Sequence, residues 1–458
     1  MDDFAIDPTS LQYVDPEGGN TFQMPKSNLP RKRRLDTLFE ESGIDMTTAL
    51  SLIPPELDSD IHSLSETSLG TLTFPFNHDT ISQNPWGPQQ HTVDALIDAC
   101  MSPLARIRDD LVKLYFVHVH PVCPVVDEYT FTTLYRFAKN DVDLLTYVEL
   151  PLLQAMMFTA LAHVSQAQLD LTPYKSVHGA QKAHFDFARA LYRLQFSTKP
   201  YVLAQVTILL TFWSPCDTEL QVNSFWLDRA YCHAREAAVW NAQTSAGTPG
   251  DRRAILWWCC LIRDRMLATG MRRPHRLHQV QNVRGMLTEE DFGLEALLPS
   301  YSSRESKKRM ISVFLASCRL SEIQADMAEY QSRFRFTRQW ETATSPGICE
   351  AEEMPSVTKF ETRLKEWKRV FEEECHSNAV SAGDNAYGST VCLVRLIASG
   401  LLLILYQPYL QWWSSVPFEA KNLWELSLRK LKEGTQQVVA NVHQLLAIAS
   451  LEAVPAFM

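Results

Sequence analysis

The chain has 458 residues, a formal net charge of −10 and only 16 glycines. This length suffices for one large helical domain, or for two or three domains of average size, with a sizeable buried core. The negative charge argues against a general binder of nucleic acid or of other polyanions, although it leaves room for a local basic patch.

Helical periodicity recurs along most of the chain beyond residue 95, whereas alternating strand patterns do not. Together with the scarcity of glycine, this pattern predicts an all-α fold with one large multi-helix domain. We expect the core of that domain in residues 96–300, and a C-terminal helical part of the same domain in residues 301–458.

The ten cysteines are scattered singly or lie next to each other, and several fall on apolar faces of expected helices. This distribution is typical of reduced thiols in an intracellular protein, where free cysteine packs as a small apolar side chain. The acidic start MDDFAIDPTS lacks the apolar region of a secretory signal. The longest apolar stretch, Leu396 to Tyr406, is too short to span a bilayer, so we expect no membrane contact.

Residues 1–95 have no sustained periodicity and are rich in Pro, Ser, Thr, Asn and Asp, so we expect a mostly disordered N-terminal segment. Within it, residues 35–41 and 50–64 mix acids with Leu, Ile and Phe, as acidic activation segments do. A disordered linker explains the same composition.

A basic tetrad also lies in this segment, directly after Pro30. It consists of Arg31, Lys32, Arg33 and Arg34. Short basic runs of this kind are read by nuclear import receptors, but a solvated charge cluster has the same sequence. The tetrad is therefore a candidate nuclear-localisation signal, and a solvated charge cluster is the alternative.

The first periodic segment begins at Arg106. One face of the expected helix carries Leu111, Leu114, Tyr115 and His118. Pro121 and Pro124 cannot continue a helix, so we expect an extended exit before the next helix begins near Thr130. Further helices are expected over residues 152–164, 184–196, 203–213 and 227–238.

The segment 251–277 contains the most apolar of the expected helices. Its apolar residues recur at i, i+3, i+4, i+7 and i+11, namely Ile255, Trp258, Cys259, Ile262 and Met266. Neighbouring apolar residues widen this face until little of the helix is left for water, which predicts a buried helix in the middle of the domain. Gly270 and Pro274 end it, and a basic loop follows.

More helices are expected in the C-terminal part, over residues 310–331, 357–374 and 391–406, and one or two over residues 423–451. We find no internal repeat at a fixed period.

The central segment resembles the fungal-specific transcription factor domain, the regulatory region of binuclear zinc-cluster transcription factors such as the cutinase transcription factors. The resemblance rests on order and spacing, in Trp257-Trp258, Arg263-Asp264-Arg265, Met266-Leu267, Gly270 and Arg273-Pro274. A second string, LYFVHVHPVCPVVDEYTFTTLY, is similar to the opening of that domain.

The chain departs from the family pattern at two places. Asn282 and Arg284 stand where the family usually has acids, and Gln407 stands where it commonly has a basic residue. Roles that depend on those residues are not carried over.

Zinc binding of the family type needs closely spaced pairs of cysteines, because six thiolates hold the two metal ions. No Cys-x-x-Cys occurs, and no cysteine precedes Cys100. We therefore expect no zinc cluster of its own in this chain, and no other cofactor. Among the histidines, His118, His120 and Cys123 form an H-x-H-x-x-C string, for which packing and turn roles are favoured over metal binding.

Catalytic motifs were sought and none was found: G-x-S-x-G, the P-loop, the dinucleotide fingerprint and H-E-x-x-H do not occur. Cys216 lacks a demonstrable histidine partner, and His275 and His278 are best explained as solvated loop histidines.

The Arg-Asp-Arg segment admits a catalytic acid or a phosphate clamp, but a buried or half-buried structural network at the helix end is favoured. For the basic loop after it, contact with an acidic partner or a nucleic-acid backbone competes with a solvated loop. The candidates for structural or partner-contact roles are Trp258, Arg263, Asp264, Arg265, Arg272, Arg273 and Pro274.

The resemblance implies a nuclear fungal transcription regulator and not an enzyme. Its helical domain would control RNA polymerase II gene expression through partner proteins or an effector, and it would reach DNA only through a partner or a missing segment. Other transcription regulators or the transcription machinery are the expected partners, and a homodimer or heterodimer is compatible with this role. The alternative is a helical enzyme or small-molecule-binding protein built on the same fold.

Overall fold

Every regular element in the described part of the chain is a helix, as the sequence predicts. The computed structural model describes residues 98–138, 144–145, 148–193, 197–213, 222–239, 252–270, 275, 285–298, 300–341, 350–377, 385–410 and 421–448. The predictions for residues 1–95, including the tetrad at 31–34, lie outside these ranges, and so do those for Cys216, Arg272, Arg273, Pro274 and His278. His275 is described and is only 6% exposed, so the expectation of a solvated histidine at this position is wrong.

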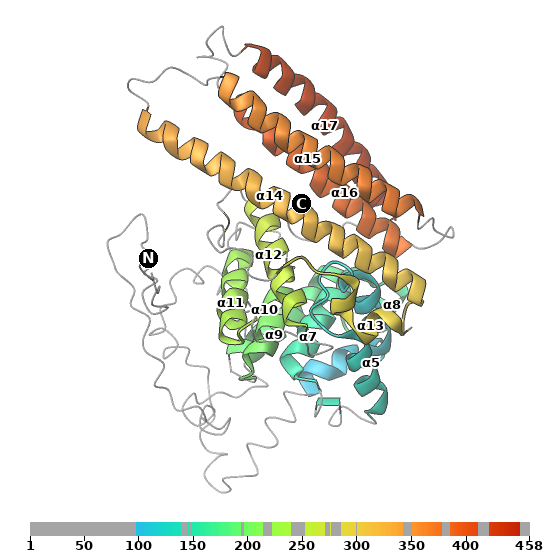
Figure 1. Cartoon of the computed structure of the whole chain (residues 1–458). Helices are drawn as coiled ribbons and strands as arrows, with labels where there is room; N and C mark the ends of the chain where they lie inside the picture. Colours follow the sequence, from blue (N-terminus) through green and yellow to red (C-terminus); the bar gives the residue numbers. More distant parts are fainter. Residues whose placement is uncertain are drawn as a thin grey trace, which may run out of the picture.

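The helices fall into two layers (Figure 1). The N-terminal layer contains η4 (Ser102–Leu104), α4 (Arg108–Leu114), η5 (Tyr115–Val119), α5 (Glu128–Phe137), α7 (Leu150–Ala160), η6 (Leu161–His163), α8 (Gln166–Leu169), α9 (Val177–Arg193), α10 (Pro200–Leu210), α11 (Val222–Glu236), α12 (Arg253–Gly270), η8 (Glu289–Phe292) and α13 (Leu294–Leu297). The C-terminal layer contains the long helices α14 (Arg304–Glu341), α15 (Glu350–Ser377), α16 (Asn385–Tyr406) and α17 (Lys421–Ile448), with η9 (Gln407–Tyr409).

Helix α14 separates two apolar cores and contributes to both. Ile311, Phe314 and Cys318 pack into the core of the N-terminal layer. Val313 and Leu320 pack into the core formed with α15, α16 and α17. Because the two sets point to different sides of one helix, α14 joins the layers without a linker.

Helix α12 is the buried central helix that the periodicity predicts. Every residue from Ile255 to Asp264 is buried, and the helix packs against α10, α11 and α14. Its apolar residues lie on all sides of the helix, so the helix has no broad polar face that would have to contact water. The burial extends to two charged residues, Arg263 and Asp264, which therefore need partners inside the protein.

A π-helical turn follows α4 and was not expected from the sequence. In η5 the amide of His120 donates to the carbonyl of Tyr115, an i→i+5 bond of 2.9 Å. The turn directs two neighbouring histidines to different places. His118 stacks on His163, with ring centroids 4.5 Å apart, while His120 enters the interior.

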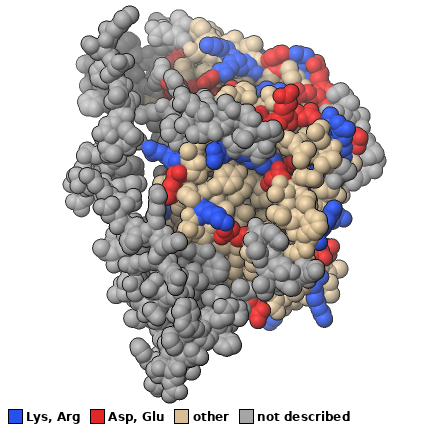
Figure 2. Space-filling model, turned by 60° about the horizontal axis from the view of Figure 1, so that its bottom comes forward, with Lys and Arg blue, Asp and Glu red and all other residues tan. Residues whose placement is uncertain are grey.

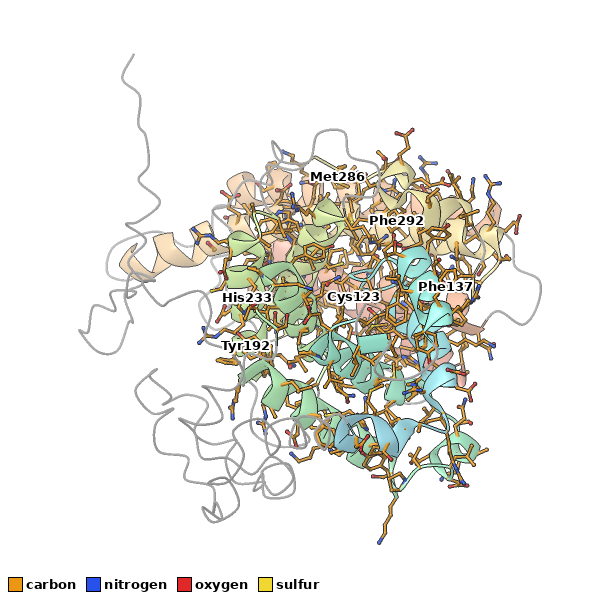
Figure 3. All side chains as sticks on the ribbon, turned by 90° about the horizontal axis from the view of Figure 1, so that it is seen from below. Cys123, Phe137, Tyr192, His233, Met286 and Phe292 are labelled. Atoms are coloured by element: carbon orange, nitrogen blue, oxygen red, sulfur yellow. The ribbon has the colours of Figure 1, made fainter. Side chains whose placement is uncertain are left out.

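The chain then bends at the two expected prolines and starts α5 at a capped N-terminus. Asp127 is the N-cap residue, and its Oδ1 accepts a 2.6 Å hydrogen bond from the amide of Thr130. Viewed from below, Cys123 lies inside the molecule near this bend, whereas Phe137 at the end of α5 lies at its margin and is 74% exposed (Figure 3).

Helix α16 is longer than expected, because it begins at Asn385. Together with η9 it is long and apolar enough to cross a membrane, with a mean hydropathy of 2.0 in its most apolar window. Half of that window is buried, and α16 packs against α14, α15 and α17. At Gly434 of α17 a Cβ atom would lie 2.7 Å from Leu403 of α16, so a glycine permits the close approach of these two helices.

A buried histidine organises the contact between α7 and α9. His184 is fully buried, its Nδ1 lies 2.7 Å from Oε1 of Gln154, and its Nε2 lies 3.1 Å from the hydroxyl of Tyr174. A neutral imidazole satisfies both contacts by donating through Nδ1 and accepting at Nε2. Burial lowers the pKa of His184 from 6.5 to about 3.

The protein should lose stability in mild acid through His184. The unfolded chain binds a proton near pH 6.5 and the folded protein only near pH 3, so the stability present above pH 6.5 declines as the pH falls between these values. Between about pH 7.5 and about pH 5 this contribution amounts to about 2 kcal/mol.

Urea unfolding of the His184→Gln variant, followed by tryptophan fluorescence, should therefore show a smaller loss between these two pH values than the parent chain. The exposed His443 on α17 provides the matched control His443→Gln, which should keep the parent's pH dependence. An unchanged loss in His184→Gln would contradict the assignment.

Candidate functional site

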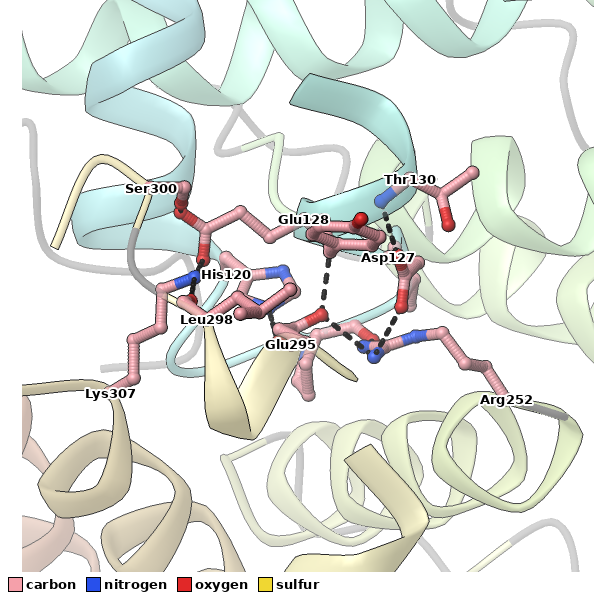
Figure 4. A network of polar contacts seen from close by, with 12 residues as sticks. His120, Asp127, Glu128, Thr130, Arg252, Glu295, Leu298, Ser300 and Lys307 are labelled. Carbon is pink, nitrogen blue, oxygen red and sulfur yellow. Dashed lines mark hydrogen bonds and ion pairs between the residues drawn. The ribbon is translucent and has the colours of Figure 1, made fainter. Parts of the chain in front are cut away.

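Six buried or half-buried charged and polar groups meet where η5, α5, α12, α13 and α14 come together (Figure 4). They are His120, Asp127, Glu128, Arg252, Glu295 and Lys307. We call this set the Glu295 network. It connects the N-terminal layer internally and also ties it to the first turn of α14.

Glu295 on α13 is the centre of the network and is only 3% exposed. Its Oε1 lies 2.6 Å from Nε2 of His120. Its Oε2 accepts a 2.9 Å hydrogen bond from the amide of Glu128, the first residue of α5, and a 2.8 Å bond from Nη1 of Arg252. One carboxylate therefore joins η5, α5 and the start of α12.

Arg252 lies directly before α12 and distributes its guanidinium among three segments. Besides Glu295, its Nη1 lies 3.4 Å from Oδ2 of Asp127, and its Nη2 donates a 2.7 Å bond to the carbonyl of Pro124. Its guanidinium carbon also lies 5.6 Å from the ring centre of Phe292. The fork geometry of arginine makes this multiple contact available to a single side chain.

Glu128 anchors the opposite edge of the network. Its Oε2 lies 3.0 Å from Nζ of Lys307 on α14, and its Oε1 accepts a hydrogen bond from the hydroxyl of Ser300. Lys307 also donates a 3.0 Å bond to the carbonyl of Leu298. The ion pair between Glu128 and Lys307 is almost fully buried, so removal of either partner leaves an uncompensated charge.

The charges in the network nearly balance, which explains how burial is tolerated. Burial alone raises the pKa of Glu295, but His120 and Arg252 outweigh it and lower the pKa to about 2. Burial likewise opposes the charge of Arg252, but Glu295 and Asp127 outweigh it and raise the pKa of the guanidinium. Glu295 and Arg252 are therefore charged at neutral pH.

The network contains a donor set that resembles a metal site. Ligand atoms of His120, Glu128 and Glu295 lie within 4.8 Å of one another. One imidazole and two carboxylates would suit a divalent cation. Arg252 and Lys307 already neutralise both carboxylates, so a cation would have to displace these two side chains. The chemistry favours a structural ion network at this position.

The cavity beside the inner side of the network is small. It measures about 40 Å³ and is lined by His120, Glu128, Glu295 and Lys307 together with apolar side chains of α14. Such a volume holds water but no substrate.

The residues singled out from the sequence that the structure describes lie on α12, and none of them belongs to the Glu295 network. Trp258 is fully buried, and its Nε1 donates a 3.2 Å bond to the carbonyl of Gly285. Arg263 donates from Nε to the hydroxyl of Thr211, at 2.8 Å, and its guanidinium lies 4.4 Å from the ring centre of Phe212. Arg263 therefore fastens α12 to the end of α10.

Arg265 points to another element than Arg263. Its Nη1 donates a 2.7 Å bond to the hydroxyl of Ser321 on α14, and its carbonyl accepts a 2.7 Å bond from Gln324. Asp264 between the two arginines is 2% exposed. The burial of this segment supports its expected structural role, which stays a prediction. Arg272, Arg273 and Pro274 lie outside the described residues.

Sequence reasoning missed most of the Glu295 network. His120 and Glu295 are 175 positions apart, and no local periodicity links them. One signal was available in the string Leu-Glu-Ala-Leu at 294–297, where a single acid stands among apolar residues. An acidic residue among apolar neighbours lies either on the exposed side of a helix or in the interior, where it needs partners for its charge.

The described part of the face in Figure 2 offers little support for contact with a polyanion. Basic and acidic side chains are interspersed over the described part of the face in Figure 2, and neither sign covers it. A nucleic-acid backbone is usually met by clustered basic residues.

A destabilising effect of the Glu295→Gln substitution is expected from the network. It keeps the size of the side chain but removes the charge that compensates Arg252, which should lower the free energy of unfolding by about 3 kcal/mol. Urea unfolding followed by tryptophan fluorescence measures the change.

The matched control is Glu289→Gln. Glu289 pairs with Lys308, and both side chains are nearly half exposed. Its loss should cost less than about 1 kcal/mol. Equal effects of the two substitutions would refute the special role of Glu295.

Comparisons with known proteins agree with the resemblance noted in the sequence. The model of the fungal specific transcription factor domain matches residues 112–369, which is more than half of the chain. A transcription factor of Fusarium pseudograminearum is 24% identical over 329 residues, covering 64% of this chain and 35% of that protein. No solved structure matches.

Two further relatives have more specific names. Cutinase transcription factor 1 beta of Fusarium vanettenii is 30% identical over 200 residues, covering 43% of this chain and 22% of that protein. The acetamidase regulatory protein of Emericella nidulans is 28% identical over 202 residues, covering 43% and 24%. The chain thus matches only about a fifth to a third of the length of these relatives.

The matched region begins in α4, contains the Glu295 network and all of α12, and ends in α15. It includes both strings that carry the resemblance in the sequence. The chain belongs to the family of fungal-specific transcription factor domains.

Proposed function

We propose that this chain is a fungal transcription regulator whose helical domain controls RNA polymerase II gene expression in the nucleus. The family match over residues 112–369 carries the proposal. The names of the relatives, a cutinase transcription factor and an acetamidase regulatory protein, agree with such a role. The domain acts as a control module that responds to partner proteins or to an effector.

The chemistry of the described residues favours regulation over catalysis. His184 and Glu295 have strongly shifted pKa values, and neighbours hold both in the interior, Gln154 in the case of His184 and Arg252 in the case of Glu295. A catalytic acid or base needs access to a substrate. The cavity that His120, Glu128 and Glu295 line is too small to admit one.

Contact with DNA is proposed to be indirect, through a partner or a segment outside this chain. A zinc cluster binds through thiolates. Burial raises the pKa of Cys259, Cys260 and Cys318, which keeps these thiols protonated. Other transcription regulators or the transcription machinery are the proposed partners, and a homodimer or heterodimer fits the same role.

The basic tetrad at residues 31–34 is the proposed import signal. Replacement of Arg31, Lys32, Arg33 and Arg34 by alanine in the full chain, fused to a fluorescent protein, should shift the fusion from the nucleus to the cytoplasm, because import receptors read the clustered charge. Fluorescence microscopy of fungal cells measures the distribution.

The control replaces two exposed basic residues of α14, as Arg304→Ala with Lys308→Ala, and keeps the buried Lys307. This variant should leave the fusion nuclear. Nuclear fluorescence that persists after loss of the tetrad would assign import to another segment or to a partner.

The regulatory role itself is tested by tethering. The full chain fused to a bacterial DNA-binding domain should change the output of a reporter gene that carries the matching operator, relative to the DNA-binding domain alone, because the helical domain recruits regulators to the promoter. Reporter transcript levels in a fungal host measure the effect, and a reporter without the operator is the control. An expressed, nuclear fusion without effect would refute the proposal.

A further inference from the structure

A cavity lies in the C-terminal layer between α15 and α17, both of which pack against α16 (Figure 1). It is lined by side chains from residues 361–372 of α15, 395–402 of α16 and 430–444 of α17, and we call it the α15–α17 cavity. Its volume is about 360 Å³. Small-molecule sites in proteins commonly measure about 300 to 1,000 Å³, so a small organic ligand fits this space.

Two polar bridges connect the walls of the cavity. Nζ of Lys430 on α17 lies 2.8 Å from Oε1 of Glu361 on α15. Nζ of Lys368 on α15 donates a 3.3 Å hydrogen bond to Oε1 of Gln437 on α17. The bridges are seven positions apart on both helices, so α15 and α17 run in the same direction along the cavity. These contacts join the two walls without a ligand.

The inner side of the cavity is apolar and partly aromatic. Leu364, Trp367 and Phe371 of α15 are 6%, 7% and 1% exposed, and all three line the cavity. The rings of Trp367 and Phe371 are stacked, with centroids 5.0 Å apart. Helix α16 adds Ala398 and Leu402. An apolar ligand gains free energy by covering such a surface, and an aromatic ring suits the neighbouring aromatic side chains.

The more deeply placed charges of the cavity are paired with one another. Glu361 lies 2.8 Å from Nζ of Lys365 and 2.8 Å from Nζ of Lys430. Oε1 of Glu372 accepts a 2.8 Å hydrogen bond from Nε of Arg395. A charged ligand would have to displace one of these partners in order to form an ion pair with the other.

Two further charges lie toward the solvent. Glu433 is 50% exposed and lies 3.6 Å from Lys430. Lys368 is exposed, and its hydrogen bond goes to the neutral amide of Gln437. Water and salt screen both charges. A charged ligand would therefore lose its hydration without a comparable gain, and the cavity favours an uncharged one.

Three amide side chains of α17 provide the polar recognition. Gln437, Asn441 and Gln444 recur at i, i+4 and i+7, and all line the cavity. Nδ2 of Asn441 donates a 3.1 Å bond to Oγ of Ser399. Among the described residues, Oδ1 of Asn441 and Nε2 of Gln437 have no hydrogen-bond partner. One acceptor and one donor are thus available on neighbouring turns, and a hydroxyl group can bond to both.

We propose that the α15–α17 cavity binds an uncharged aromatic compound with a hydroxyl group, such as a naphthol. The ring system packs on Leu364, Trp367 and Leu402. The hydroxyl group donates to Oδ1 of Asn441 and accepts from Nε2 of Gln437. That the ligand acts as an effector rests on the regulatory function proposed above, whereas binding itself does not.

Trp367 connects the cavity to the helix that joins the two layers. Its Nε1 donates a 2.9 Å hydrogen bond to the carbonyl of Ala316 on α14. Ala316 is fully buried in the core of the C-terminal layer. A ligand that packs on Trp367 is therefore one side chain away from α14. An effect on the domain requires that the ligand bind two arrangements of these helices with different affinities.

Isothermal titration calorimetry of the purified full chain tests the site with 2-naphthol, 2-naphthoate and 2-naphthylmethylammonium. The three compounds share the ring system and differ in charge. 2-Naphthol should bind saturably and about tenfold more tightly than the anion or the cation, because the charged groups lose hydration without an unpaired buried charge to meet. Either charged compound binding as tightly as 2-naphthol would overturn the proposal.

Substitutions at neighbouring positions of α17 locate the binding. Ala440 is exposed and lines the cavity, so Ala440→Phe should fill part of it and weaken 2-naphthol binding about tenfold or more. Val439→Phe introduces the same side chain one position earlier, outside the lining residues, and should bind like the parent.

A second pair of variants tests the hydrogen bond. Gln437→Leu removes the amide that donates to the ligand and should weaken 2-naphthol binding about fivefold. Gln436→Leu changes an exposed glutamine that does not line the cavity and should leave the affinity unchanged. Circular dichroism verifies that each variant is folded.

Parent-like affinity in both Ala440→Phe and Gln437→Leu, or the absence of saturable 2-naphthol binding by the parent, would refute the site. A tethered fusion that changes reporter output while 2-naphthol fails to bind would refute only this site. Saturable binding together with a tethered fusion that has no effect on the reporter would refute the regulatory function and leave the site intact.

Discussion

The carboxylate of Glu295 is the interaction on which the N-terminal layer depends. It holds His120 of η5, the first amide of α5 and Arg252 before α12 at distances of 2.6 to 2.9 Å. An ion buried to this degree is unfavourable unless each oxygen is satisfied, so the surrounding segments have little freedom to shift independently. Apolar packing provides the bulk of the stability, and the Glu295 carboxylate holds these three segments together.

Helix α14 transmits that order to the C-terminal layer. Lys307 in its first turn pairs with Glu128, and farther along the helix Arg265 of α12 binds Ser321. Between these polar contacts, α14 fills both apolar cores. A change that shifts the start of α12 is thereby coupled by direct contacts to the long helices, although no coupling energy follows from contact alone.

Much of the helical layout could be predicted, because the buried residues of a helix recur every three or four positions in the sequence. The run Ile255–Asp264 was recognisable from spacing alone, and so were the bend at Pro121 and Pro124 and the four C-terminal helices. The candidate site could not be predicted in this way. Its pairings join residues far apart in the chain, and the partner of Glu295 is set by how α13 turns at Gly293, which no pattern in the neighbouring residues encodes.

The apolar character of α16 has a consequence for biosynthesis. The cellular machinery that inserts helices into membranes selects for length and hydropathy, both of which α16 satisfies before it is folded. Helices α14 and α15 precede it in the chain and are ready to cover one side as it leaves the ribosome. Helix α17 follows within about 2 to 8 seconds at ordinary rates of translation. The order of the helices along the chain thus limits the time during which α16 could be misdirected or could aggregate.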